Sequence, residues 1–303
     1  MDKLSNAIWE ESAKDYEAYA SGVILSAGGF IFNSEMVKKY GGKADHTMAL
    51  GTVHDSGLGI QLGQKVGGDV AHMDSLSIWR FLSPPSDFIR GVVVDGKGQR
   101  ILNEDLYGAT FTKKMVDEHD GKGYLFLDRE IWAAAKRNGP KESLSFQALM
   151  MQYLFKLGHY KANSIAELAK KVKLPEEVVV ETITEYNNAI FLGKDEPMHK
   201  TTEAATPLLR PPFYCVNVSI KNSPFNPAPA LTLGGLRVNE ETGEVLRADG
   251  SEISGLYAAG RTAVGICSNS YLSGLSLADG MFSGRRAARH IANVASRVDT
   301  VEV

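Results

Sequence analysis

The placement of glycine constrains the fold of this chain more than any other feature. The chain has 30 glycines among 303 residues, and two short apolar runs, residues 23–29 and 255–260, end in glycine near opposite ends of the sequence. An apolar run of this length is typical of a buried strand, and the glycines after it allow a tight turn with a positive φ. In α/β sheets, ligands bind where such strands end. The sequence therefore predicts an α/β sheet built from both ends of the chain.

The region between these two strands has a different character and predicts an inserted α+β domain. We expect strands at residues 91–94 and 123–128, and helices at 108–118, 128–137, 145–157, 164–172 and 175–191. Ser164 and Glu167 have the spacing of a capping box at a helix start, and the prolines at 207–212 and 224–229 predict an extended return. The predicted domains are residues 20–70 and 232–296 for the interrupted α/β unit, and residues 71–231 for the insert.

Three further helices are expected outside the insert. Residues 2–19 have helical composition, residues 56–66 carry apolar side chains at helical spacing, and residues 273–291 predict a long closing helix. The apolar spacing of this last helix predicts that four side chains face inward: Leu275, Leu277, Met281 and Phe282.

Composition and charge exclude several classes of protein. The 33 basic and 36 acidic residues give a net charge of -3, which offers no field for nucleic acid, and no apolar run approaches the roughly 20 residues of a membrane-spanning helix. Cys215 and Cys267 are too few for a disulfide framework, so we expect a reducing, cytoplasmic location. The 7 histidines show no metal-ligand spacing, so no metal site is predicted.

Five ordered motifs are more specific than this general pattern. They are Ser26-Ala-Gly-Gly-Phe30, His54-Asp-Ser-Gly-Leu-Gly59, Gly98-Gln-Arg-Ile-Leu-Asn-Glu-Asp-Leu-Tyr107, Thr232-Leu-Gly-Gly-Leu236 and Gly255-Leu-Tyr-Ala-Ala-Gly-Arg261. In this order the motifs resemble those of the fumarate reductase and 3-ketosteroid dehydrogenase superfamily of flavoproteins. The segment 270–285, with Tyr271 and Ser273 before the last helix, is most similar to the 3-ketosteroid Δ4-(5α)-dehydrogenase branch.

The resemblance implies an FAD-dependent oxidoreductase in which a partial Rossmann-like FAD-binding domain is interrupted by a catalytic cap domain. The implied reaction is dehydrogenation of a carbon–carbon bond next to a ketone, with a small hydrophobic, steroid-like substrate; the electron acceptor stays open. The fumarate reductase branch has a histidine directly before the TxGG motif, whereas this chain has Pro229, Ala230 and Leu231 there. A C4-dicarboxylate substrate is therefore disfavoured, and a fumarate reductase-like flavoprotein is kept as an alternative.

Dehydrogenation next to a ketone needs a hydride acceptor, a base for the α-proton and donors for the developing enolate oxygen. The resemblance makes Tyr107, Tyr271 and Ser273 the candidate catalytic residues. A tyrosine, with a pKa of about 10, acts as a base only when its surroundings stabilise the phenolate. The candidate cofactor-binding residues are Ala27, Gly28, Gly29, Asp55, Gly57, Gly260, Arg261, Gly274, Ser276 and Leu277. Four aromatic residues suit either a flat polycyclic substrate or the protein core: Trp79, Phe81, Phe88 and Phe225.

The superfamily holds the ADP half of FAD on a Gly-x-Gly-x-x-Gly unit, which has no match in this chain because Leu62 follows Gly57 and Gly59 where the third glycine is needed. Arg261 also replaces the glutamate that usually ends the last motif. We therefore expect activity only when the missing N-terminal unit is supplied, in a longer product or by a partner, and we expect association with that partner or as a homo-oligomer. The alternative is a non-catalytic remnant or a binding module that keeps the apolar cleft.

Overall fold

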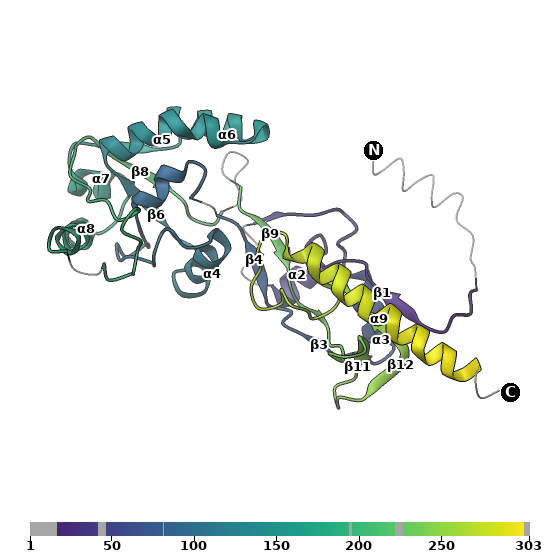
Figure 1. Ribbon diagram of the computed structural model, residues 1–303. Helices are drawn as coiled ribbons and strands as arrows, with labels where there is room; N and C mark the ends of the chain where they lie inside the picture. Colours follow the sequence, from purple (N-terminus) through teal and green to yellow (C-terminus); the bar gives the residue numbers. More distant parts are fainter. Residues whose placement is uncertain (1–16, 42–46, 81, 194–195, 222–226, 300–303) are drawn as a thin grey trace.

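The chain folds into two lobes that lie side by side (Figure 1). The computed structural model describes residues 17–41, 47–80, 82–193, 196–221 and 227–299. The first lobe consists of the described residues before 80 and after 226, and the second lobe consists of those between. Most of the helix expected at residues 2–19 lies outside the described residues, and residues 17–19 are not helical.

The main sheet of the first lobe joins the two ends of the chain. β1 (Val23–Leu25) pairs in parallel with β12 (Glu252–Ala258), and β11 (Glu244–Leu246) pairs antiparallel on the far side of β12. The predicted sheet from both ends of the chain is therefore confirmed. The expectation that β1 is buried is wrong in part, because β1 is an edge strand among the described residues and Val23 is 53% exposed.

Two smaller sheets complete the first lobe. One has the order β2-β9-β4, formed by β2 (Met48–Ala49), β9 (Pro229–Thr232) and β4 (Leu76–Ile78), and the other pairs β3 (Val70–Ala71) with β10 (Gly235–Leu236). Two short helices, α2 (Ser34–Tyr40) and α3 (Leu58–Lys65), lie in the same lobe, and α3 matches the helix expected at residues 56–66. These pairings place the strands that lead into the second lobe beside those that lead out of it.

Arg80 fixes the crossing between the lobes. Its Nη1 donates to the Pro227 carbonyl at 3.0 Å, and its Nη2 donates to the Ser219 carbonyl at 3.2 Å. Burial lowers the pKa of Arg80 to about 10, so its guanidinium is still charged at neutral pH. The two connecting segments are therefore held together by one buried cation that bonds to two backbone oxygens of the returning segment between β8 and β9.

The second lobe is built on an antiparallel sheet in the order β5-β6-β8-β7. Its strands are β5 (Val92–Val94), β6 (Tyr124–Leu127), β8 (Phe213–Asn217) and β7 (Tyr160–Ala162). The core beside this sheet includes Trp132, which stacks on Tyr214 with 4.5 Å between ring centroids. Phe88 packs against Trp132 in the same core, so it is a core residue and not part of a substrate cleft. Phe81 and Phe225 lie outside the described residues.

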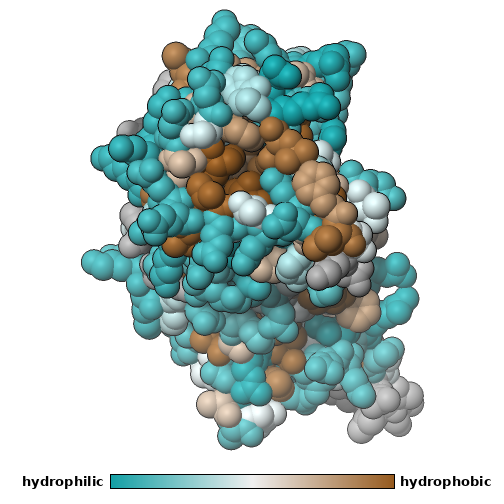
Figure 2. All heavy atoms as spheres, turned by 90° about the vertical axis from the view of Figure 1, so that its left-hand side faces the viewer, coloured by the Kyte–Doolittle hydropathy of each residue, from teal (hydrophilic) through white to brown (hydrophobic). Residues whose placement is uncertain are grey.

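The helices of the second lobe confirm the local sequence signals. They are α4 (Gly108–Glu118), α5 (Arg129–Glu142), α6 (Ala148–Lys156), α7 (Ile165–Lys171) and α8 (Glu176–Phe191). At the start of α7, Ser164 Oγ accepts the Glu167 N–H at 3.1 Å, whereas the Glu167 carboxylate accepts the N–H of Asn163 and not that of Ser164. On the outer face of this lobe, apolar side chains gather in the upper half of Figure 2.

The long last helix, α9 (Leu275–Asp299), exposes three of the four side chains predicted to face inward, while Leu275 packs on the apolar cluster of Leu231 and Cys267. The helix runs across the first lobe near β12 (Figure 1) and buries Asp279, Ser283 and Ala287, one residue per turn. Three residues expected to face inward are 77%, 67% and 54% exposed: Leu277, Met281 and Phe282. Small side chains at the buried positions allow the helix to lie close to the sheet, so the apolar stripe marks a face that no described residue covers. No helix in the described ranges has the length and apolar character to cross a bilayer.

Asp95 gives a test of stability in the second lobe. Its carboxylate accepts the N–H groups of Lys97 at 2.8 Å and Gln99 at 3.0 Å, and lies 3.0 Å from His119 Nδ1. Burial raises the pKa of Asp95, but the hydrogen bonds from His119, Gln99 and Lys97 together outweigh burial and lower it. We expect Asp95→Asn to reduce the free energy of unfolding by about 1–3 kcal/mol at pH 7.

The sign of the pH dependence follows from this lowered pKa. The stability that Asp95 contributes is present above its unfolded pKa of about 3.9 and is lost as pH falls through the folded value. Urea unfolding of both proteins at pH 7 and pH 3 checks this. The difference between them should shrink at pH 3, and a difference that stays constant would contradict the assignment.

Candidate functional site

The turns that follow β1 and β12 meet at one edge of the first-lobe sheet. Asp55 links them, because its Oδ1 accepts the Gly29 N–H at 3.1 Å and the Arg261 Nη2 at 3.0 Å. The Gly57 N–H donates to the Gly29 carbonyl at 2.9 Å, and Gly28 has a φ of +80°. Five of the residues predicted to bind the cofactor are therefore brought together.

The contact of Arg261 with Asp55 explains why this chain has arginine where the superfamily usually has glutamate. Asp55 is buried, and the Arg261 guanidinium is the cation that neutralises its carboxylate. A glutamate at position 261 would bring a second negative charge toward Asp55 and would be unfavourable there. Arginine at this position therefore joins the two turns by an ion pair.

Three hydroxyl groups that hold these turns are absent from the predicted site residues. Their contacts are Phe30 N–H to Thr232 Oγ1 at 3.0 Å, Thr262 Oγ1 to the Gly28 carbonyl at 3.1 Å, and Gly260 N–H to Ser283 Oγ at 2.9 Å. Thr232 opens the TxGG motif, which is a sequence signal that could have identified it. Thr262 bonds across 234 positions and Ser283 lies inside a helix, so neither carries a local signal.

A hollow of about 390 Å³ opens between these turns and α9. Four of its lining residues are glycines, Gly28, Gly260, Gly280 and Gly284, and a Cβ on either of the last two would meet no atom within 4 Å. Its volume falls in the range of small-molecule sites, about 300–1,000 Å³. Glycines at strand ends allow a phosphate or sugar to approach the backbone closely. The lining therefore fits part of the FAD expected from the sequence.

The remaining predicted cofactor residues lie around this hollow or close to it in sequence. Ser276 lines it from the first turn of α9, while Leu277 points into solvent. Ala27 belongs to the turn after β1, and Gly274, with a φ of +87°, directly precedes α9. The N–H groups in the first turn of a helix lack carbonyl partners within the helix and favour an electron-rich ligand. At α9, those of Leu275 and Leu277 donate to the carbonyls of Leu272 and Gly274.

Gly28 provides a direct test of how closely the turns pack. A Cβ at Gly28 would overlap the Asp55 carboxylate, whereas a Cβ at Gly250, which has a similar φ of +85°, would meet nothing within 4 Å. We expect Gly250→Ala to cost about 1–2 kcal/mol through backbone strain alone. Gly28→Ala should cost about 1–3 kcal/mol more because of the overlap. Urea unfolding measures both variants, and equal costs would show that the turn has room for a side chain.

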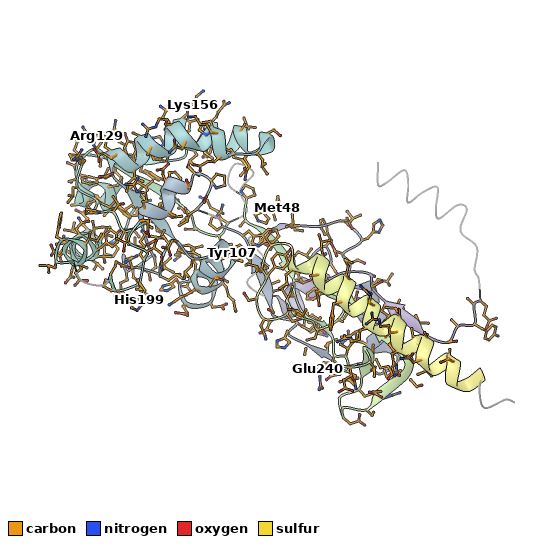
Figure 3. All side chains as sticks on the ribbon, viewed as in Figure 1. Met48, Tyr107, Arg129, Lys156, His199 and Glu240 are labelled. Atoms are coloured by element: carbon orange, nitrogen blue, oxygen red, sulfur yellow. The ribbon has the colours of Figure 1, made fainter. Side chains whose placement is uncertain are left out.

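Tyr107 and Ser273 meet across the two lobes. The Ser273 N–H donates to Tyr107 Oη at 2.9 Å. Tyr107 directly precedes α4, where the second lobe approaches the first (Figure 3). Because α9 begins at Leu275, the residue next to the helix is Gly274, so helix capping does not account for Ser273. The structure thus brings together two of the three predicted catalytic residues.

Tyr271 lies two residues before Ser273 and packs on Trp79, with 5.4 Å between ring centroids. Both rings pack against an apolar cluster that includes Leu231 and Cys267. Burial, with a smaller contribution from Asp279, raises the pKa of the Cys267 thiol. The thiol therefore stays protonated near neutral pH and is a poor nucleophile.

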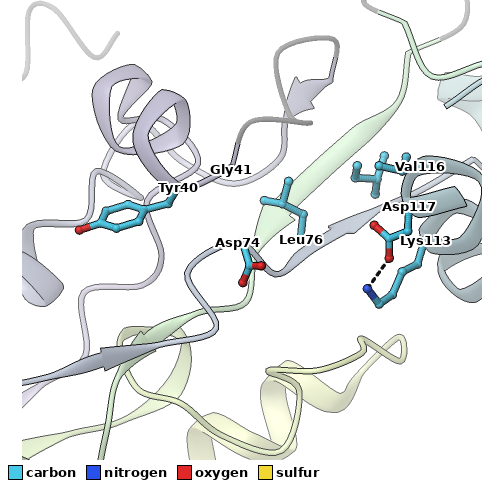
Figure 4. A pocket seen from close by; sticks show the side chains of 8 residues that line it. Tyr40, Gly41, Asp74, Leu76, Lys113, Val116 and Asp117 are labelled. Atoms are coloured by element: carbon cyan, nitrogen blue, oxygen red, sulfur yellow. Dashed lines mark hydrogen bonds and ion pairs between the residues drawn. The ribbon is translucent and has the colours of Figure 1, made fainter. Parts of the chain in front are cut away.

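A second hollow, of about 200 Å³, lies between α2, β4 and α4 (Figure 4). Tyr40, Asp74 and Leu76 line one side, and an ion pair from Lys113 Nζ to Asp117 Oδ2 at 2.7 Å borders the other. None of the predicted catalytic or cofactor-binding residues lines it. We assign this hollow no part in the reaction.

Comparison with known proteins gives the family. A family model described as an FAD binding domain matches residues 3–277. The chain is 32% identical over 210 residues to 3-oxo-5-alpha-steroid 4-dehydrogenase of Comamonas testosteroni, covering 67% of this chain and 38% of that protein. It is 26% identical over 285 residues to NADH:fumarate oxidoreductase of Klebsiella pneumoniae, covering 90% of this chain and 29% of that protein.

A solved relative shares the fold. The crystal structure of 3-ketosteroid-delta4-(5alpha)-dehydrogenase from Rhodococcus jostii RHA1 matches with a TM-score of 0.77 at 29% identity, covering 90% of this chain and 53% of that chain. The chain thus spans about half of the solved relative and less of the two curated ones. These matches confirm the resemblance carried by the five motifs, and the chain belongs to the FAD binding domain family of oxidoreductases, whose cofactor is FAD.

Proposed function

We propose that this chain carries the catalytic part of an FAD-dependent dehydrogenase that oxidises a carbon–carbon bond next to the ketone of a hydrophobic, steroid-like substrate. The observation that carries the proposal is the contact between the Ser273 N–H and Tyr107 Oη at 2.9 Å. This hydrogen bond brings together candidate catalytic residues from the two lobes. Ser273 follows the third candidate, Tyr271, by two positions. The names of the Comamonas and Rhodococcus relatives support a steroid ketone as the substrate.

The proposed chemistry divides two tasks among three side chains. When bound, FAD supplies the hydride acceptor. Tyr271, in its phenolate form, takes the proton from the carbon next to the ketone and becomes a neutral phenol. The nearby N-terminal end of α9 favours the negatively charged form that precedes this step. Tyr107 and Ser273 donate hydrogen bonds to the ketone oxygen as it becomes an enolate. The apolar surroundings of Tyr271 and Trp79 exclude water and strengthen the hydrogen bonds to the enolate oxygen.

The residues that would hold FAD are those of the two turns and the start of α9. Gly28, Gly29 and Gly260 allow close approach of the backbone, while Asp55 and Arg261 fix the two turns relative to each other. Ala27, Gly57, Gly274, Ser276 and Leu277 complete the proposed set. The proposed domains remain 20–70 with 232–296 for the FAD-binding part and 71–231 for the catalytic cap.

The uncovered face of α9 and the outer edge of β1 form the proposed contact with the Gly-x-Gly-x-x-Gly unit, supplied by another part of the protein or by a partner chain. Met281 and Phe282 expose apolar side chains there. A free strand edge next to an exposed apolar face suits a strand followed by a helix.

The visible spectrum of the purified chain, recorded after incubation with excess FAD and desalting, tests the cofactor site. With the Gly-x-Gly-x-x-Gly unit added, retained flavin absorbance and reduction of a dye acceptor by a 3-ketosteroid are the expected results. Flavin retention with turnover of fumarate but not of ketosteroids would replace the substrate with that of the fumarate reductase branch. A colourless protein would identify a non-catalytic remnant or a site completed only by the missing unit, and addition of that unit separates the two.

A further inference from the structure

Four charged side chains are buried together in the second lobe, apart from the turns that would hold FAD. Glu104 Oε2 lies 2.6 Å from Arg100 Nη2 and 3.0 Å from Lys200 Nζ, and Arg100 also pairs with Glu196. None of the four side chains is more than 7% exposed. Two cations and two carboxylates make the cluster neutral as a whole.

The cluster is tied to the backbone and to one aromatic ring. Glu104 Oε1 accepts the Val93 N–H at 2.8 Å, and Lys200 Nζ donates to the Gly91 carbonyl at 2.5 Å. The Tyr186 ring lies 4.9 Å from Arg100 Cζ and 5.3 Å from Lys200 Nζ. Burial lowers the pKa of Lys200, and Glu104 opposes this shift. A buried ionic cluster often stabilises a protein no more than apolar packing would, so stability alone is a weak reason for it.

The same residues lie where two segments run together, the loop 101–107 and the segment 196–201. Asn103 Nδ2 donates to the His199 carbonyl at 2.9 Å, 96 positions away in sequence. The Thr201 N–H donates to Asp105 Oδ2 at 2.9 Å, and the Asp105 N–H donates to Asn103 Oδ1 at 2.9 Å. The loop is thus held along its length by a distant segment, and it ends at Tyr107.

We propose that Glu196 and Lys200 are positioning residues for Tyr107, acting through Glu104 and the loop 101–107 to set where the Tyr107 hydroxyl meets Ser273. The inference rests on the proposed function, in which Tyr107 holds the ketone oxygen. Neither Glu196 nor Lys200 touches the substrate in this arrangement. Glu104 transmits their position, because it pairs with Lys200 directly and with Glu196 through Arg100.

The Tyr107 hydroxyl needs such support because a hydrogen-bond donor acts only at a narrow range of distances. A donor to a developing oxyanion must lie within about 2.7–3.1 Å of it, and a misplacement of about 1 Å can cost about 100-fold in rate. Tyr107 stands at the junction of a loop and a helix, and its hydroxyl meets the other lobe. A rigid anchor on the loop keeps this hydroxyl from moving independently of its own lobe.

The experiment is NMR of the chain labelled with 13Cζ-tyrosine, in which loss of a signal in Tyr107→Phe identifies Tyr107. We expect Lys200→Met to shift the Tyr107 signal by more than its linewidth and to leave that of Tyr257, in the first lobe, in place. Lys200→Arg keeps the cation and should return the Tyr107 signal toward its original position. In FAD-loaded protein, Lys200→Met should lower kcat by about 10- to 100-fold with a smaller change in KM.

Two further variants keep the test decisive. Asp105→Asn loosens the bond to Thr201 and keeps all four side chains of the buried cluster, and it should shift the Tyr107 signal even if Lys200→Met does not fold. Ile183→Ala, one turn from Tyr186 on α8, removes core packing without removing a charge. An unshifted Tyr107 signal in Asp105→Asn, or an equal shift in Ile183→Ala, would overturn the proposal. Lack of ketosteroid turnover would overturn the proposed function alone, because the NMR needs no substrate.

Discussion

Tyr271→Phe is expected to lower turnover of a 3-ketosteroid by about 100- to 10,000-fold, the usual contribution of a positioned general base. The substitution removes only the hydroxyl, so the ring still packs on Trp79 and the apolar cluster keeps its shape. KM should change little, because the hydroxyl acts mainly on the proton that leaves in the transition state. A dye-coupled assay on FAD-loaded protein measures both constants, and a thermal unfolding curve checks that the fold is intact.

Tyr160→Phe is the matched control for this experiment. Tyr160 lies on β7 of the second lobe, is about half exposed, and belongs to none of the proposed binding sets. Its substitution should leave both constants within a factor of about two. A Tyr271→Phe enzyme that keeps more than a third of the original turnover would remove Tyr271 from the proton-transfer step.

The second large effect concerns the uncovered face of α9. We expect the isolated chain to associate through this face, because exposed apolar patches and free strand edges favour self-association. Met281 and Phe282 are among its exposed apolar side chains, and replacing both with Glu places two negative charges in the patch. The double variant should elute as a monomer near the 32.9 kDa of the chain, whereas the original chain should elute at twice that mass or more.

Light scattering coupled to size-exclusion chromatography makes this measurement. The control is Asn293→Glu with Ser296→Glu, which adds the same charge to exposed positions of the same helix outside the patch. That control should associate as the original chain does. A monodisperse monomer of the original chain at tens of micromolar would contradict the prediction.

Much of the second lobe could be predicted from the sequence because its signals are local. The helices at α4, α5 and α8 follow side-chain periodicity, and Ser164 opens α7 as its spacing with Glu167 predicts. The two glycine turns were also predictable, since a positive φ leaves few residue choices. Local physical chemistry therefore accounts for the elements and for the position of the turns.

The wrong prediction for α9 and the residues that the sequence analysis missed have a common physical cause: both depend on contacts between distant parts of the chain. The inward face of α9 was predicted from apolar periodicity, which marks the face to be buried but does not say against what. The helix instead packs on the sheet with Asp279, Ser283 and Ala287. Thr232, Thr262 and Lys200 were missed because each acts on residues distant in sequence, and such pairings leave no local pattern. Tyr107 and Ser273 are also distant in sequence, but both could be predicted as site residues because each belongs to a family motif. The structure joins them by a hydrogen bond.

The pairing of β1 with β12 also determines the order in which the chain can fold. The second lobe is continuous in sequence, so it can collapse as soon as its residues have left the ribosome. The first-lobe sheet has to wait for the last strand, and β1 stays without its neighbour through most of synthesis. Pairings between distant residues form slowly and leave strand edges open to other chains. Chaperone demand during synthesis should therefore fall mainly on the segment around β1, not on the second lobe.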